Sequence, residues 1–119
     1  MILWVDSDPS RAATVWRQSS AARCSSTIWC REASEAIDVL REYTLEEAHL
    51  EHDLGSSDSR SELSGMEIVR WLERLKDRSQ FSNTRFIVHS HAPAGATMVD
   101  RLRKIDLRAD LIPFGSTIR

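Results

Sequence analysis

Hydrophobic residues follow two patterns along the chain, short apolar or β-rich runs and longer stretches with apolar residues at helical spacing. Short unbroken apolar runs are typical of strands that are covered on both faces. The clearest are Ile2 to Val5 and Phe86 to Val88, and the mixed segments are 25–30, 47–52 and 109–112. Segment 47–52 is polar at alternate positions and is the weakest of these. We predict five strands from these segments.

Apolar residues at helical spacing predict a helix after each of the first four strands. The first begins at Pro9, with Asp8 as its N-cap. The second covers Ala33 to Tyr43, the third begins at Ser64 to Glu67, which fit a capping box, and the fourth carries its apolar stripe along 98–105. Regular alternation with short connections implies a parallel sheet with helices on both faces. We predict an α/β fold with a five-stranded, doubly wound parallel sheet.

Composition narrows the class of protein. A chain of 119 residues with 41% hydrophobic and 29% charged residues predicts one packed domain over 1–119. The net charge of −2 gives no strong DNA-binding signal. No apolar run is long enough for a membrane span, and the apolar run MILWV at the amino terminus is too short and uncharged for a secretory signal. Cys24 and Cys30 match no zinc or redox spacing, which favours reduced thiols in a cytoplasmic protein.

Polar side chains with catalytic potential follow three of the predicted strands. In open parallel sheets, ligands bind beyond the carboxyl ends of the strands, so this clustering indicates a site. The residues are Asp6, Ser7 and Asp8 after the first strand, His52 and Asp53 after the third, and His89, Ser90 and His91 after the fourth.

The aspartates of this group predict a divalent cation site. A carboxylate at the end of an apolar strand, such as Asp6 or Asp53, is costly unless it binds a cation or accepts hydrogen bonds. Two such carboxylates facing each other repel, and a divalent cation relieves the repulsion. We predict Mg²⁺ or Mn²⁺ held by Asp6, Asp8 and Asp53, with helix capping as the competing role of Asp8.

The four histidines of the chain divide into two groups. His49 and His52 are three residues apart, which on a strand sends their side chains to opposite faces, so we assign His52 to the site and a structural, partly buried place to His49. His89 and His91 can share a face, and histidines at this edge suit acid/base chemistry or phosphate binding. Ser90 can donate a hydrogen bond to an oxyanion, but no glycine pattern of a nucleophile elbow surrounds it.

The pattern resembles the receiver domains of two-component signalling, a flavodoxin-like fold. ILWVDSDP is similar to their acidic first loop, Asp53 falls at the phosphoacceptor position, and Ser90 matches the hydroxyl residue that ends the fourth strand. SGME is similar to the start of their third helix, and a proline–aromatic pair follows the fifth strand. Ser7 stands in place of a second acid and Ile112 in place of a lysine that contacts the phosphoryl group. The chain also ends soon after the fifth strand, so we expect the last helix of that fold to be missing.

A narrower resemblance is to the cyclic-phosphate-processing receiver family. That family has a histidine beside the third-strand aspartate and a His-Ser-x-Asn-Pro motif at the fourth strand. The matching residues lie in HLEHDLG and IVHSHAPAGATMV, and they are His52, Asp53, His89, Ser90 and Pro93. Ala92 stands in place of the asparagine. The resemblance implies processing of cyclic or terminal phosphates on nucleotides or RNA.

Two functions follow as hypotheses. The first is a metal-assisted cyclic-phosphate hydrolase, in which His52 and His89 act with Asp53 as the proton-transfer and catalytic groups, while Ser90 and His91 bind the phosphate. The second is a divergent receiver module, phosphorylated on Asp53 or degenerate, that acts through protein contacts. An inactive scaffold whose histidines satisfy one another is a third interpretation. The sequence leaves the oligomeric state open.

Overall fold

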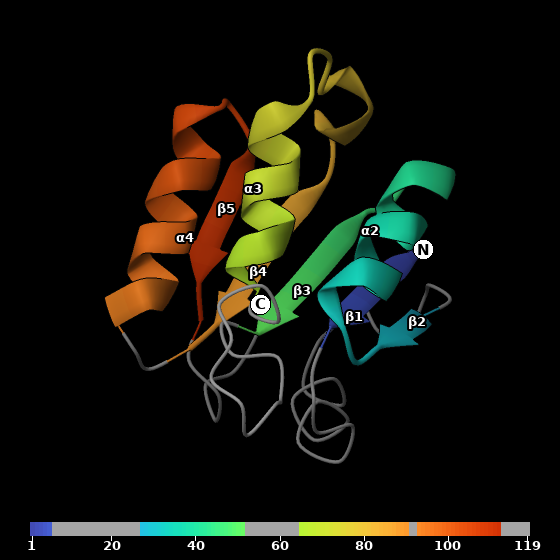
Figure 1. Ribbon diagram of the computed structural model, residues 1–119, viewed down its shortest axis with the longest axis horizontal. Helices are drawn as coiled ribbons and strands as arrows, with labels where there is room; N and C mark the ends of the chain where they lie inside the picture. Colours follow the sequence, from blue (N-terminus) through green and yellow to red (C-terminus); the bar gives the residue numbers. More distant parts are fainter. Residues whose placement is uncertain (6–26, 52–64, 91–92, 113–119) are drawn as a thin grey trace.

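The computed structural model describes residues 1–5, 27–51, 65–90 and 93–112. Five strands, all parallel, form one sheet in the order β2-β1-β3-β4-β5 (Figure 1). The polar third strand is the centre of this sheet. The strands are β1 (Ile2–Val5), β2 (Thr27–Cys30), β3 (Glu47–Glu51), β4 (Arg85–His89) and β5 (Arg108–Leu111).

Helices α2, α3 and α4 cover one face of the sheet (Figure 1). Their bounds are α2 (Ala33–Glu42), α3 (Met66–Arg74) and α4 (Pro93–Lys104). Leucine and valine side chains at alternate strand positions point to these helices, because successive side chains of a strand face opposite sides of a sheet. Leu3, Leu50 and Val88 from the strands pack in one core with Leu40, Leu72 and Leu102 from the helices. The helix predicted from Pro9 lies outside the described residues.

The opposite face of the strands carries a different set of side chains. These side chains are almost completely buried, although two of them are imidazoles: Ile2, Trp4, His49, Ile87 and His89. Imidazoles are unusual in the central strands of a parallel sheet, which are normally rich in Val, Ile and Leu. This face therefore holds buried polar groups that require hydrogen-bond partners.

The predicted α/β fold, with its five parallel strands, is confirmed. The start of α3 differs in detail from the predicted capping box, because Gly65 is the N-cap residue and no side chain makes a cap hydrogen bond. Ser64 lies outside the described residues. A short 3-10 helix, η3 (Ser79–Phe81), was not expected, since a single turn has too few residues to show helical periodicity. Among the described residues, no helix has the length and apolar character needed to cross a bilayer.

Candidate functional site

The carboxyl ends of β1, β3 and β4 lie side by side in the sheet. Val5 is in register with Leu50, and Glu51 is in register with His89. These are the strands after which the predicted site residues follow in the sequence. Most of those residues lie outside the described part of the chain, namely Asp6, Asp8, His52, Asp53 and His91. His89 and Ser90 are described.

Ser90 lies against the first turn of α4. It is buried, and a Cβ built on Gly95 would come within 2.6 Å of the Ser90 Cβ and 2.9 Å of its Oγ. Only glycine at position 95 allows this approach, so a serine side chain and the amino-terminal turn of a helix adjoin at the carboxyl edge of the sheet. Backbone N–H groups in such a turn suit an anion.

His89 is buried at the end of β4, with only 1% of its surface exposed. Its Nδ1 lies 2.7 Å from the backbone carbonyl oxygen of Ile112, and its Nε2 lies 2.9 Å from Nδ1 of His49. Because a carbonyl only accepts, Nδ1 of His89 carries a hydrogen and donates it. Burial lowers the pKa of His89 to about 4, with His49 as a further cause, so the imidazole is neutral near pH 7.

His49 lies in the middle of β3 and is fully buried, where the sequence predicted a structural, partly buried residue. Its Nε2 lies 2.9 Å from Oε1 of Glu47, at the opposite end of the same strand from the predicted site. The planes of the two imidazoles are 4° apart, and the Trp4 ring stacks on His49 with centroids 4.0 Å apart. Glu47, His49, His89 and the Ile112 carbonyl thus form a continuous hydrogen-bonded series, which we call the histidine chain.

The histidine chain reaches the backbone position that the resemblance assigns to a phosphoryl-contacting lysine. The N–H group of Ile112 donates to the carbonyl of Val88 at 2.9 Å, and its carbonyl accepts from His89. Two contacts therefore hold the backbone of Ile112 at the carboxyl end of β5.

Glu47 was not among the predicted site residues. The available signal was the alternation of Glu47, His49 and Glu51, which places three polar side chains on one face of a strand. In the sequence this alternation indicates a weak strand, whereas β3 is central and the three side chains are largely buried. A polar stripe in a central strand predicts an internal hydrogen-bond network, because buried polar groups require partners.

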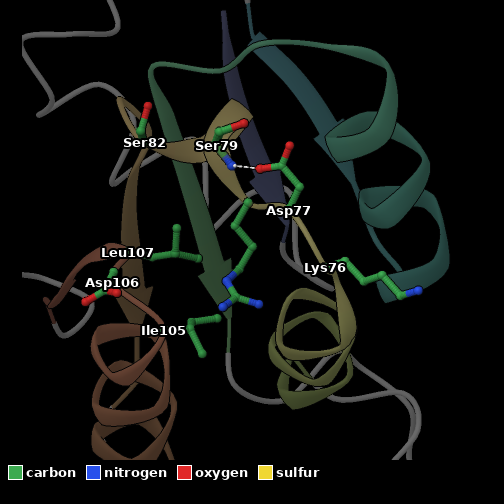
Figure 2. A pocket seen from close by; sticks show the side chains of 8 residues that line it. Lys76, Asp77, Ser79, Ser82, Ile105, Asp106 and Leu107 are labelled. Carbon is green, nitrogen blue, oxygen red and sulfur yellow. Dashed lines mark hydrogen bonds between the residues drawn. The ribbon is translucent and has the colours of Figure 1, made fainter.

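A pocket of about 290 Å³ lies away from the carboxyl edge, beside the segments that precede β4 and β5 (Figure 2). Its lining mixes charges of both signs, and Asp77 accepts a hydrogen bond from the backbone N–H of Ser79 at 2.9 Å. The guanidinium of Arg78 donates a hydrogen bond to the backbone carbonyl of Leu75 at the end of α3. These polar groups serve the local turns, and neither of the two described site residues, His89 and Ser90, lines the pocket.

A family model of the cyclic-phosphate processing receiver domain matches residues 1–104. The chain belongs to this family. The family assignment agrees with the resemblance that HLEHDLG and the His89-Ser90 pair indicate in the sequence. A search of the curated proteins found no match.

Solved structures similar to this family member are response regulator receiver domains. A CheY-like receiver domain protein from Methanospirillum hungatei has a TM-score of 0.64 at 12% identity, over 97% of this chain and 81% of that one. A two-component response regulator from Clostridium difficile has a TM-score of 0.65 at 11% identity, over 97% and 83%. A response regulator from Burkholderia pseudomallei, with a phosphorylated aspartic acid, calcium ion and citrate, has a TM-score of 0.62 at 17% identity, over 92% of this chain and 57% of that one. At these identities the likeness shows the receiver fold.

Within the residues that the structure describes, no group of three or more His, Cys, Asp or Glu side chains is placed to hold a metal ion. The predicted ligands Asp6, Asp8 and Asp53 lie outside those residues. Three carboxylates are nevertheless the kind of donor set that Mg²⁺ or Mn²⁺ accepts.

Proposed function

We propose that this receiver-family domain hydrolyses a cyclic phosphate, or a related phosphate ester, of a nucleotide or RNA. The observation that carries the proposal is the adjacency of β1, β3 and β4 in the sheet. Asp6, Asp53 and Ser90 follow these three neighbouring strands directly or within two residues in the sequence. Membership of the cyclic-phosphate processing family supports the choice of a phosphate ester as the substrate.

The proposed reaction opens a phosphate ring with water. The oxygen of water bonds to phosphorus while one P–O ester bond breaks, so one proton leaves the water and one proton reaches the departing oxygen. His52 and His89 are the proposed proton-transfer pair, of which one takes the proton from water and the other gives a proton to the departing oxygen, and Ser90 and His91 donate to the other phosphate oxygens. Both ring nitrogens of His89 have partners in the described fold. His89 therefore takes part only if its Nε2 leaves Nδ1 of His49 and contacts the substrate instead.

Asp6, Asp8 and Asp53 are the proposed ligands of Mg²⁺ or Mn²⁺. A bound cation of this kind neutralises charge on phosphate oxygens.

The test is hydrolysis of a 2′,3′-cyclic nucleotide by the full chain, with Mg²⁺, with Mn²⁺ and with a chelator. We expect turnover that requires one of the metals and that falls by about 100-fold or more in His52→Gln and in Asp53→Asn. Asp38→Asn is the matched control, because Asp38 is an exposed residue of α2 that pairs only weakly with Arg41 at 3.8 Å. His89→Ala is a poor test, since it removes a buried ring from the histidine chain.

Absence of turnover by the wild-type chain with either metal contradicts the proposed function. Equal turnover in Asp53→Asn and Asp38→Asn contradicts the assigned site. Circular dichroism of each variant must match the wild-type spectrum, so that loss of activity reports on chemistry rather than on folding.

The second candidate is a receiver module phosphorylated on Asp53. The similarity to a response regulator with a phosphorylated aspartic acid favours it, although the side chain at position 112 is isoleucine. Incubation with acetyl phosphate, followed by intact-mass measurement, separates the two candidates. The hydrolase proposal predicts no lasting adduct. A stable phosphoryl adduct that disappears in Asp53→Asn, without turnover of the cyclic nucleotide, supports the receiver function instead.

A further inference from the structure

The histidine chain contains three close contacts between groups that can all accept a hydrogen bond. They are Glu47 to His49 at 2.9 Å, His49 to His89 at 2.9 Å, and His89 to the Ile112 carbonyl at 2.7 Å. The two ends of the series, a carboxylate and a carbonyl, have no hydrogen to give when the carboxylate is ionised. Every hydrogen in the series must then come from the two imidazoles.

Two neutral imidazoles bring only two hydrogens to these three contacts. If His89 donates to Ile112 through Nδ1, its Nε2 accepts, so His49 must donate through Nδ1. Nε2 of neutral His49 then presents a lone pair to the carboxylate of Glu47. If His49 instead donates to Glu47 through Nε2, its Nδ1 accepts from Nε2 of His89. The lone pair on Nδ1 of His89 then faces the carbonyl oxygen of Ile112. With two hydrogens, one contact therefore always joins two acceptors at 2.9 Å or less.

Burial alone favours the state with two hydrogens. Burial lowers the pKa of His49 against the opposing effect of Glu47, and the hydrogen bond with His49 lowers the pKa of the Glu47 carboxyl. Both imidazoles would then be neutral beside an ionised carboxylate. The contact geometry decides against this state, because all three separations are those of formed hydrogen bonds.

We propose that Glu47 and His49 share a third hydrogen, which completes the histidine chain and holds His89 on the carbonyl of Ile112. The shared hydrogen makes the Glu47–His49 pair neutral as a whole, as an acid beside an imidazole or a carboxylate beside an imidazolium. His89 does not take it, because a charged His89 would lie almost fully buried and far from the carboxylate. The backbone at the carboxyl end of β5 is thereby linked to a proton at the other end of β3.

The described groups around the pair belong to four strands. On β3, Glu51 shares the face of His49 at the far end of the strand. On β4, Arg85 lowers the pKa of both Glu47 and His49 through its charge, and His89 is in direct contact with His49. On β5, Asp110 binds Arg85 at 3.0 Å and offsets part of that charge. On β1, Trp4 stacks on His49 and carries no charge.

The third hydrogen gives stability a definite pH dependence. In the unfolded chain at pH 8, a glutamate is ionised and histidines are neutral, so the three side chains hold no hydrogen beyond the two of the imidazoles. The native state holds one more, and stability falls as pH rises wherever the native state holds more protons than the unfolded state. The unfolding constant should therefore rise up to tenfold per pH unit above about pH 7.5 until the native state releases the hydrogen.

Glu47→Gln tests this directly, because the amide of glutamine can donate to Nε2 of a neutral His49. Each of the three contacts then contains one hydrogen while both imidazoles are neutral, and no hydrogen is shared. We expect the ratio of the wild-type and Glu47→Gln unfolding constants, measured by urea titration from pH 7 to pH 9.5, to rise up to tenfold per pH unit. Glu42→Gln, at an exposed position that ends α2, is the matched control and should keep a constant ratio to wild type.

Nitrogen-15 NMR of the imidazole rings provides the second measurement. We expect His89 to carry its hydrogen on Nδ1 alone at pH 7.5, and His49 to show Nδ1 protonated and Nε2 in a shared hydrogen bond with Glu47. A constant stability ratio above pH 7.5 overturns the proposal, as does a His89 ring protonated on Nε2 alone. Neither outcome depends on any enzymatic activity, so the proposal stands or fails apart from the hydrolase function.

Discussion

Replacing Trp4 by alanine is expected to lower the free energy of unfolding by about 3–5 kcal/mol. Trp4 is 1% exposed in the middle of β1, and its ring stacks on His49 and lies over His89 with centroids 5.2 Å apart. The variant loses the transfer free energy of the indole and leaves a cavity beside two imidazoles. Urea unfolding followed by circular dichroism measures the change without using tryptophan fluorescence.

Trp29→Ala is the matched control for this experiment. Trp29 lies in register with Trp4 on the neighbouring strand β2, with ring centroids 5.8 Å apart, but it is 42% exposed. Its replacement should cost roughly 1 kcal/mol, because much of the ring is already in contact with solvent. Equal losses for the two variants would contradict this prediction, because they would show that burying Trp4 against the imidazoles stabilises the protein no more than the half-exposed Trp29 does.

Strands β1 and β4 could be predicted because their apolar runs are local features. Residues 2–5 and 86–88 are apolar on both faces, and this pattern identifies a buried parallel strand without knowledge of its neighbours. The histidine chain could not be predicted in the same way. His49 and His89 are 40 residues apart, and their contact depends on the pairing of β3 with β4 and on the register of that pairing.

The same distinction between local features and long-range contacts applies to the candidate site. The convergence of strand ends follows from the alternation of strands and helices, so the sequence places Asp6, Asp53 and Ser90 after strands that the structure shows to be neighbours. The role of His89 is a matter of individual contacts. A histidine at a strand end is equally compatible with proton transfer and with an internal hydrogen bond, and only the positions of His49 and Ile112 distinguish these environments.

Gly65→Ala is expected to destabilise the chain by about 3 kcal/mol, the upper part of the usual range for overpacking. Gly65 has φ −59° and ψ −21°, a helical conformation that alanine adopts without strain. On backbone grounds alone the change should stabilise the protein by about 0.4–1 kcal/mol, because alanine restricts the unfolded chain. A Cβ at this position, however, would overlap the backbone carbonyl oxygen of Glu51 and approach Met98.

The direction of the Gly65→Ala effect is therefore the decisive readout. The side chain of Met98 can rotate away, but the Glu51 carbonyl belongs to the end of β3 and can move only with the strand. Glu51 also directly precedes His52 and Asp53 in the sequence, so its displacement would shift the strand end from which the candidate site residues follow. Thermal unfolding of Gly65→Ala measures the loss. A variant as stable as wild type would contradict the close approach of α3 to β3, and with it the reason for glycine at the start of this helix.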